Sequence, residues 1–453
     1  MKVCVIGAGK VGATIAEALS EENHDIVVID RKREILDNLS NCLDVLCVHG
    51  NAVNLATLRE AGADQADILI AATSSDEINM LCCIFGKKIG ARHTIARVRN
   101  PEYFEQMLAM KQDLGMELII NPELAAADEI ARVIRIPGAL KVETFSRGRV
   151  ELVEMKLKEG NPLIHCQLST LYAAFGVKVL ICTVERKEEV IIPDGSFTLQ
   201  QGDRITLTAS RGNISEFLRS LGLAQTRMKN VLIVGGGRIS VYLARQLQAM
   251  QCRTTIIEIS EQRCAELSEL LPHTTIVCAD GTDPQILQEA GFLECDAAVL
   301  MTGVDEENFV LAMYAETCAV PKIICKLSRG GYADILQQAL PQATIIAPKN
   351  ITAEQIIQQV RARQNATGSN VETLYKIISG KAEALEFAVR KNSAHLNIPL
   401  KDLPLKPGIL IAAILRNGRA LIPNGNDCLK LHDNVIVMTT CSSCNDLEDL
   451  FLR

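Results

Sequence analysis

Apolar runs of four to six residues alternate with longer amphipathic segments over the first 135 residues of the chain. The runs predict six strands, at 2–6, 25–30, 45–48, 68–72, 94–98 and 117–120. The segments between them are long enough for helices, and this alternation is typical of a parallel sheet with helices on both faces. The pattern therefore predicts a doubly wound α/β domain.

A different pattern follows between residues 137 and 222. Short β-like runs lie at 151–157, 177–184 and 205–209, and turn signals stand at Pro193-Asp194-Gly195 and Gly202-Asp203. Such short strands with frequent turns predict a small α+β module.

The whole pattern occurs twice. Motifs of the first half return in the same order 228 to 230 residues later: Gly7-Ala8-Gly9 as Gly235-Gly236-Gly237, Asp30 as Glu258, Glu60-Ala61-Gly62 as Glu289-Ala290-Gly291, and Ile192-Pro193 as Ile422-Pro423. We interpret this as an internal duplication. The predicted organisation is two tandem Rossmann-like doubly wound domains, 1–135 and 229–365, each followed by a small α+β module, 137–222 and 367–453. The segment 222–229 joins the copies, and 364–370 is a polar linker.

Composition supports a globular chain and excludes several classes of protein. The chain has 453 residues, 48% of them hydrophobic and 22% charged, as expected for about three domains. Its formal net charge is −7 and no basic stripe is interleaved with aromatic residues, so no nucleic-acid partner is predicted. No apolar run approaches the roughly 18 residues that cross a bilayer, and the N-terminus lacks the features of a signal peptide. Any membrane association is therefore expected to be peripheral.

Sixteen cysteines in a chain without an export signal indicate free thiols in a reducing cytosol. Four of them lie in apolar strand patterns and are predicted to pack in the core: Cys4, Cys182, Cys278 and Cys325. Cys441 and Cys444 have no second Cys or His pair nearby, and the seven histidines are scattered. No metal site is therefore predicted.

The first glycine loop, Gly7-Ala8-Gly9-Lys10-Val11-Gly12, directly follows a predicted strand and opens a helix. Gly7 permits a tight turn, Gly9 lets a pyrophosphate approach the backbone, and Gly12 lets the helix pack on the strand. The helix N-terminus offers free N–H groups to phosphate, and Asp30 would accept hydrogen bonds from ribose hydroxyls. The context predicts a nucleotide site. A glycine turn that serves packing alone is the alternative.

The spacing of these residues does not distinguish NAD(H) from ATP or ADP, because all of them carry a phosphate chain and a free ribose diol. NADP is disfavoured, since Asp30 would face its 2′-phosphate, although Arg31, Lys32 and Arg33 follow directly and could offset the repulsion. The residues alone therefore leave NAD(H), ATP and ADP open.

The second loop, Gly235-Gly236-Gly237-Arg238-Ile239-Ser240, keeps the two glycines that face phosphate and has serine in the third position. Serine is small enough for the helix to approach the strand, and Glu258 stands where the first copy has Asp30. The loop predicts a second nucleotide site, with a remnant used only for packing as the alternative.

Further candidate residues follow the later strands, at the carboxyl edge where ligands of open α/β sheets bind. They are Thr73 and Ser74 after the fourth strand, Arg97 at the end of the fifth, and the second-copy counterparts Thr302, Gly303 and Lys326. Arg97 is expected to point toward phosphate, with a buried salt bridge to an acid such as Asp76 as the alternative. Asp76 and Glu77 are predicted to cap the helix that follows them.

No duplicated catalytic residue accompanies the duplicated loops. A hydride-transfer enzyme needs a positioned acid or base beside the nicotinamide. The histidines of the small modules, His165 in the first and His395 and His432 in the second, do not recur in register. This indicates a non-enzymatic nucleotide sensor. The alternatives are an NAD-dependent dehydrogenase with a fused pseudo-copy and a structural scaffold with vestigial loops.

Taken together, these motifs resemble the TrkA family, the cytosolic regulatory subunits of bacterial Trk potassium uptake systems, which carry two tandem RCK modules. The resemblance spans essentially the whole chain: the first glycine loop with Asp30, EAGADQAD at 60–67, TSSDEIN at 73–79, IARVRNPEY at 95–103, and the same elements in the second copy. It implies two Rossmann-like RCK N-terminal domains, each followed by an RCK C-terminal module.

The resemblance also implies site residues and partners. The first nucleotide would contact Gly7, Ala8, Gly9, Lys10, Val11, Asp30, Thr73, Ser74 and Arg97, and the second would contact Gly235, Gly236, Gly237, Arg238, Ile239, Glu258, Thr302, Gly303 and Lys326. Ser240 and Lys326 depart from the first-copy pattern. The implied protein is a ring-forming homo-oligomer, cytoplasmic and peripheral on the inner face of the membrane. It would couple NAD(H) or adenine-nucleotide binding to gating of a TrkH-like potassium-translocating membrane subunit.

Overall fold

A computed structural model describes residues 1–22, 24–136, 138–146, 148–187, 189–222, 228–365, 371–377, 381–390, 393–440 and 446–452. The chain forms two compact units: Met1–Asp128 with Ala347–Val360, and Glu129–Ile346 with Arg361–Arg453. Most of the predicted joint at 222–229 and of the predicted linker at 364–370 lies outside the described residues, as do Cys441 and Cys444.

The first unit is built on a six-stranded parallel sheet of order β3-β2-β1-β4-β5-β6. Its elements are β1 (Lys2–Ile6), α1 (Lys10–Ser20), β2 (Asp25–Asp30), α2 (Arg33–Cys42), β3 (Leu46–His49), α3 (Leu55–Glu60), the 3₁₀ turn η1 (Ala63–Gln65), β4 (Ile68–Ala71), α4 (Asp76–Ile89), β5 (His93–Arg97), α5 (Pro101–Met110), β6 (Leu118–Ile120) and the first half of α6 (Pro122–Arg135). Every predicted strand lies within one residue of an observed one, which confirms the doubly wound class.

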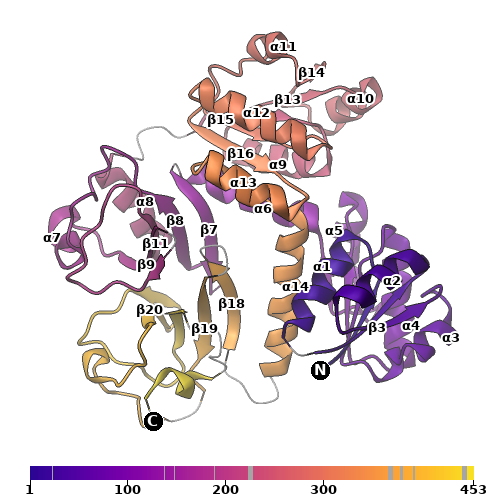
Figure 1. Ribbon diagram of the computed structural model, residues 1–453, viewed down its shortest axis with the longest axis horizontal. Coiled ribbons are helices and arrows are strands. Elements are labelled where there is room, and N and C mark those ends of the chain that lie inside the picture. The colour runs from indigo at the N-terminus through magenta and orange to yellow at the C-terminus, as the bar shows by residue number, and fades with distance from the viewer. Residues whose placement is uncertain are drawn as a thin grey trace. The chain divides into compact units, whose positions relative to one another are not determined.

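A helix from the second copy completes the core of this unit. The helix is α14 (Pro348–Asn365), and Ala353, Ile356 and Val360 are buried with Val3 and Val5 of β1 in one apolar cluster. Figure 1 shows α14 beside α1. The limits of the four domains, which follow the repeat, stay a prediction. The packing adds that the last helix of the second Rossmann-like copy covers the first sheet.

The second unit contains a second six-stranded parallel sheet, of order β14-β13-β12-β15-β16-β17. Its elements are β12 (Asn230–Val234), α9 (Arg238–Ala249), β13 (Arg253–Glu258), α10 (Glu261–Leu270), β14 (Thr275–Cys278), α11 (Pro284–Glu289), β15 (Ala297–Leu300), α12 (Asp305–Thr317), β16 (Lys322–Lys326), α13 (Gly330–Ala339) and β17 (Thr344–Ile346). In order of appearance, both sheets run 3-2-1-4-5-6, the arrangement of a dinucleotide-binding Rossmann fold. The duplication seen in the sequence is therefore a duplication of the fold.

The two small modules are five-stranded antiparallel sheets. Their strand orders match when both are given in the same direction, as β10-β9-β11-β8-β7 and β21-β20-β22-β19-β18. The first contains β7 (Ala139–Phe145), β8 (Val150–Lys156), η2 (Leu168–Thr170), α7 (Leu171–Phe175), β9 (Leu180–Arg186), β10 (Glu189–Ile191), β11 (Arg204–Ser210) and α8 (Arg211–Ser220). The second contains β18 (Val371–Ile377), β19 (Ala382–Ala388), η3 (Leu400–Asp402), β20 (Ile409–Arg416), β21 (Arg419–Leu421), β22 (Asn434–Thr439) and η4 (Leu447–Leu450). The sequence pattern had predicted β8, β9 and β11 but not β7 or β10.

The two small modules share one hydrophobic core. Phe145, Leu152 and Cys182 of the first are buried in the same cluster as Ala384 and Ile436 of the second. The Ser146 hydroxyl also donates a hydrogen bond to the buried Glu386 carboxylate of the other module. The second module also has a cluster of its own around Leu385 and Phe387, so the shared cluster adds to that core and joins the two modules.

The fourteen cysteines in the described part of the chain are all free thiols. Cys4, Cys182 and Cys325 are buried, as predicted, and burial raises the pKa of Cys4 to about 12. The prediction for Cys278 was wrong, because this residue is exposed. It is the last residue of β14, which is an edge strand of the second sheet and pairs with only one other strand, β13.

A buried lysine joins the second sheet to the first small module. Lys322 begins β16, is only 4% exposed, and donates a hydrogen bond to the carbonyl of Ala139 in β7. Next to it, the Thr344 hydroxyl donates to the carbonyl of Leu140 at 2.9 Å. Burial, with a smaller effect from the charge of Lys158, lowers the pKa of Lys322 from 10.5 to about 7.

This pKa gives a testable pH dependence. The folded chain loses the Lys322 proton near pH 7, whereas the unfolded chain keeps it up to about pH 10.5, so the unfolded state binds more protons in that window. Stability should therefore rise with pH, by at most about 1.4 kcal/mol per pH unit, relative to a Lys322→Met variant. Calorimetric melting at pH 7 and pH 9 measures this, with the exposed Lys178→Met as control. An equal difference in Tm between wild type and Lys322→Met at both pH values would show that Lys322 does not titrate there.

Candidate nucleotide sites

The first glycine loop leaves the end of β1 and turns into α1. Gly7 has a φ of +95°, and a Cβ there would lie 2.9 Å from the Cα of Thr73. A Cβ at Gly12 would lie only 1.8 Å from the carbonyl oxygen of Gly7. By contrast, nothing lies within 4 Å of a Cβ built on Gly9. The protein itself requires glycine at positions 7 and 12, whereas the open space at Gly9 is where a ligand could approach the backbone.

An acidic side chain fixes each loop from the end of the neighbouring strand. Asp30 accepts hydrogen bonds from the Ala8 N–H at 2.7 Å and the Lys32 N–H at 2.8 Å. Glu258 accepts from the Gly236 N–H at 2.7 Å and the Ser260 N–H at 3.0 Å. The extra methylene of glutamate therefore does not change the arrangement, and both carboxylates lie beside their glycine loops.

A buried asparagine clamps the strand ends next to each loop. Asn79 is fully buried, accepts hydrogen bonds from the Thr73 N–H and hydroxyl at 2.8 and 2.7 Å, and donates to the Arg97 carbonyl at 2.9 Å. Asn308 makes the corresponding bonds to the Thr302 N–H at 2.8 Å and the Lys326 carbonyl at 3.0 Å. No role was predicted for these asparagines, although their recurrence in register in the two copies was a signal.

The prediction that Asp76 caps its helix was wrong. Ser75 is the N-cap of α4 and accepts from the Ile78 N–H at 3.2 Å. The Asp76 carboxylate instead accepts from the N–H groups of Arg99 and Asn100 at 2.9 and 2.8 Å. In the second copy the Asp305 carboxylate accepts hydrogen bonds from the N–H groups of Ser328 and Arg329, which follow β16. These buried carboxylates hold the loop that follows the fifth strand of each sheet.

Arg97 lies beside the first loop, but its acidic neighbour is not Asp76. Its guanidinium donates to the Thr73 carbonyl at 3.3 Å and lies 3.9 Å from the Glu123 carboxylate. The structure thus brings Gly7, Asp30, Thr73 and Arg97 to one edge of the first sheet. The other predicted residues of this site differ in exposure: Ala8 is buried, Val11 is partly buried, and Lys10 and Ser74 are exposed.

A cavity of about 390 Å³ lies at the carboxyl edge of the second sheet. Its lining includes seven of the nine residues predicted for the second nucleotide: Gly235, Gly236, Gly237, Glu258, Thr302, Gly303 and Lys326. The other two do not line it, because Arg238 is exposed on α9 and Ile239 is buried.

The cavity also has lining residues that were not predicted from the sequence. Asp280, Gly281 and Thr282 follow β14, and Glu307 lies in the first turn of α12. Hydrogen bonds from the Thr282 N–H and hydroxyl hold the pKa of Asp280 below its usual value. The signal was the place of this segment after the third strand, at the same sheet edge as the glycine loop.

The two departures from the first-copy pattern fit this cavity. The Ser240 hydroxyl donates a hydrogen bond to the Gly235 carbonyl at 2.5 Å. The counterpart of this carbonyl in the first copy is that of Gly7, which a Cβ at Gly12 would approach to 1.8 Å. Lys326 donates to the carbonyls of Met301 and Thr302 at 3.2 and 2.6 Å, and burial lowers its pKa. The second copy therefore keeps an open glycine loop, an acidic partner and a cation at the strand end.

Comparison with known families identifies the chain. Residues 3–122 and 231–348 match the TrkA-N domain, and residues 152–222 and 384–452 match the TrkA-C domain. The chain belongs to the TrkA family. Two TrkA-family relatives are named as potassium uptake proteins of Trk systems. The Archaeoglobus fulgidus homolog is 32% identical over 451 residues and the Vibrio alginolyticus protein 30% over 456, with 100% of this chain and 98 to 100% of each relative covered.

Solved structures of GsuK, a channel protein, show the same fold. The GsuK channel bound to NAD superposes with a TM-score of 0.64 at 18% identity, over 97% of this chain and 76% of the other. The GsuK RCK domain alone superposes with a TM-score of 0.64 at 18% identity and 96% and 92% coverage. GsuK bound to ADP matches with a TM-score of 0.51 at 14% identity, over 80% of this chain and 69% of the other. At these identities the likeness establishes the tandem RCK fold of this TrkA-family chain and no more.

Proposed function

We propose that this chain is a nucleotide-sensing regulatory subunit of a potassium uptake transporter, with one nucleotide site on each Rossmann-like sheet. The observation that carries the proposal is the cavity at the second loop, where Gly237 leaves the backbone open, Glu258 holds the loop and Lys326 supplies a cation. Relatives named for Trk potassium uptake, and a GsuK neighbour bound to NAD, support the same function.

The nucleotide is NAD(H), with ATP or ADP as alternatives. Glycine loops without side chains at Gly9 and Gly237 would receive the phosphates, and Asp30 and Glu258 would accept hydrogen bonds from the ribose. Both carboxylates would repel a 2′-phosphate, which disfavours NADP. The GsuK structures with NAD and with ADP support a fold that receives either kind of nucleotide.

The proposed regulation depends on how the second cavity is connected to the ends of β15 and β16. A ligand in the second cavity would touch Gly303 and Lys326, and Asn308 ties the backbone of these two strand ends together. Binding can shift a conformational equilibrium only by its difference in affinity for the two states. A change from 1:99 to 99:1 takes about 5.5 kcal/mol, which two sites per chain in a ring would share.

We propose that the chain is not an enzyme and works peripherally on the inner face of the membrane with a TrkH-like subunit. In the described part of the chain, no helix is both long and apolar enough to span a bilayer. Incubation with NAD and a panel of alcohols and hydroxy acids tests the dehydrogenase alternative. Formation of reduced cofactor would contradict the sensor proposal.

Potassium flux through the reconstituted membrane partner tests the function directly. We expect the flux to differ between saturating NAD or ATP and no nucleotide, and the difference to disappear in a chain that carries both Asp30→Ala and Glu258→Ala. Identical flux with and without nucleotide in the wild type would contradict the regulatory role.

Glu258→Ala should weaken nucleotide binding at the second site by about 1.5–3 kcal/mol, the scale of a hydrogen bond to a charged group. The variant loses the ribose acceptor and the bond that holds the Gly236 N–H. Glu258→Gln keeps an acceptor for this N–H and should lose less. Isothermal titration with NAD and ATP measures both, and unchanged affinity in Glu258→Ala would remove this residue from the site.

A further inference from the structure

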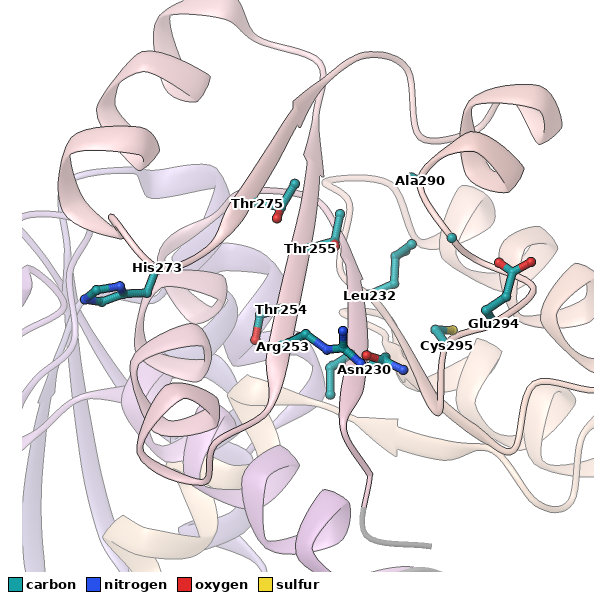
Figure 2. Close-up of a pocket in the computed structure, with 12 residues that line it drawn as sticks. Asn230, Leu232, Arg253, Thr254, Thr255, His273, Thr275, Ala290, Glu294 and Cys295 are labelled. Carbon is teal, nitrogen blue, oxygen red and sulfur yellow. The ribbon is translucent and has the colours of Figure 1, made fainter.

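A second cavity, of about 380 Å³, lies on the same sheet but at the opposite, amino edge (Figure 2). Its lining comes from the first residues of β12, β13 and β14, from His273 just before β14, and from the segment 290–295 after α11. It shares no residue with the cavity at the glycine loop. The nucleotide site therefore does not account for it.

The first copy shows how this edge looks when the space is filled. Lys2 and Asp25 are register partners at the starts of β1 and β2, and the Lys2 ammonium lies over Gly62, 2.7 Å from where a Cβ would stand. In the second copy the register partners are Asn230 and Arg253. Asparagine is too short to cover the corresponding Gly291, and the nearest atom to a Cβ there is the Glu294 carboxylate at 3.9 Å. The shorter side chain accounts for the opening of the cavity.

The floor of the cavity has also become polar. Val27 and Leu46 are register partners on β2 and β3, and their counterparts are Thr255 and Thr275, which are register partners on β13 and β14. Figure 2 shows both threonines on the sheet beside Leu232. Within the described ranges, neither threonine hydroxyl has a hydrogen-bond partner. Hydroxyls in place of aliphatic side chains give this sheet surface donors and acceptors that a ligand or water can use.

Two opposite charges face this cavity without compensating each other. The change from Asp25 to Arg253 replaces an acid with a base, while its register partner changes from Lys2 to the neutral Asn230. Among the residues that the structure describes, no carboxylate lies within 4 Å of the Arg253 guanidinium and no cation lies within 4 Å of the Glu294 carboxylate. Guanidinium is well matched to a carboxylate, and a free carboxylate to an ammonium group.

We propose that the amino-edge cavity binds a small zwitterion of the amino-acid class. Its carboxylate lies on Arg253 and the Asn230 amide, its ammonium group faces Glu294, and its body lies on Thr255, Thr275 and Leu232. The site is distinct from the nucleotide site and gives the second Rossmann-like domain a second small-molecule input. The proposal does not depend on nucleotide binding, since each ligand can be titrated alone.

Titration of the full chain with each of the common amino acids, by calorimetry or ligand-observed NMR, tests the proposal. At least one should bind saturably, and Arg253→Gln and Glu294→Gln should each weaken it by about tenfold or more. Asn230→Lys installs the first-copy residue and should block the cavity without loss of the fold. Arg245→Gln, which removes an exposed arginine from α9 of the same domain, should bind like the wild type.

Three results would overturn the proposal. They are no saturable binding of any amino acid at millimolar concentration, unchanged affinity in Arg253→Gln, and succinate or inorganic phosphate binding as tightly as the amino acid irrespective of Glu294. Nucleotide titrations of the same variants should match the wild type. Failure of the zwitterion site therefore stays separable from failure of the nucleotide sites.

Discussion

Alanine in place of Gly9 or Gly237 is expected to leave the fold intact and to remove nucleotide binding from the altered copy. Both residues have ordinary backbone angles for alanine, with φ of −66° and −69°, and a Cβ at either position meets no protein atom within 4 Å. The protein therefore has no reason of its own for glycine there. A phosphate that approaches the helix N-terminus would meet the added methyl group, and affinity should fall about a hundredfold or more.

The test compares melting with binding. Each variant should melt within a degree or two of the wild type, because the methyl group stands in open space. Titration with NAD and ATP should show the altered site lost and the other site unchanged. A variant that keeps full affinity would mean that the ligand does not lie on the glycine loop. A variant that unfolds would mean that Gly9 or Gly237 serves packing.

Valine in place of Gly12 is expected to give the opposite result, a large loss of stability in the first Rossmann-like domain. A Cβ there would stand 1.8 Å from the Gly7 carbonyl oxygen, and because this oxygen belongs to the backbone and the Cβ would be fixed to the Cα of α1, neither could move aside cheaply. The cost should reach about 3 kcal/mol or more, at the upper end for overpacking. Differential scanning calorimetry measures the shift of the unfolding transition that contains β1 and α1.

The second copy supplies the matched control for this prediction. Ser240 occupies the equivalent place and donates its hydroxyl to the Gly235 carbonyl. Ser240→Gly should therefore cost only about 1–2 kcal/mol, from one hydrogen bond and the lower helix propensity of glycine. Equal losses in Gly12→Val and Ser240→Gly would contradict the steric account of the first loop.

The Rossmann-like halves were predictable because their strands are continuous apolar runs and their helices fill the intervals. Both sheets are parallel and covered, so local hydrophobicity reports burial directly. The small modules were less predictable. Their central cluster is formed jointly by residues such as Phe145 and Ile436, almost 300 residues apart, and no local pattern contains that partner. For the same reason the packing of α14 in the first unit could not be expected from the repeat, which placed it with the second.

In the candidate sites too, residues close in sequence were predictable, whereas residues brought together only by the fold were not. In each copy the glycine loop and its acidic residue, Asp30 or Glu258, lie within about 25 residues of each other in sequence, and the strand-loop-helix context positions them. Asp280 and Glu307 come from other loops of the sheet edge and become neighbours of Gly237 only through the fold. Asp76 was misassigned because its sequence position suits a cap, whereas the burial of its carboxylate against the loop after β5 is a tertiary feature.

The most direct test of the central claim is the number of nucleotides that one chain binds. Calorimetric titration of the full chain with NAD, and separately with ATP, should give two sites per chain for the better ligand, one site in either Gly9→Ala or Gly237→Ala, and none in the double variant. A double variant that still binds two nucleotides per chain, or a wild type that binds neither ligand, would contradict the account.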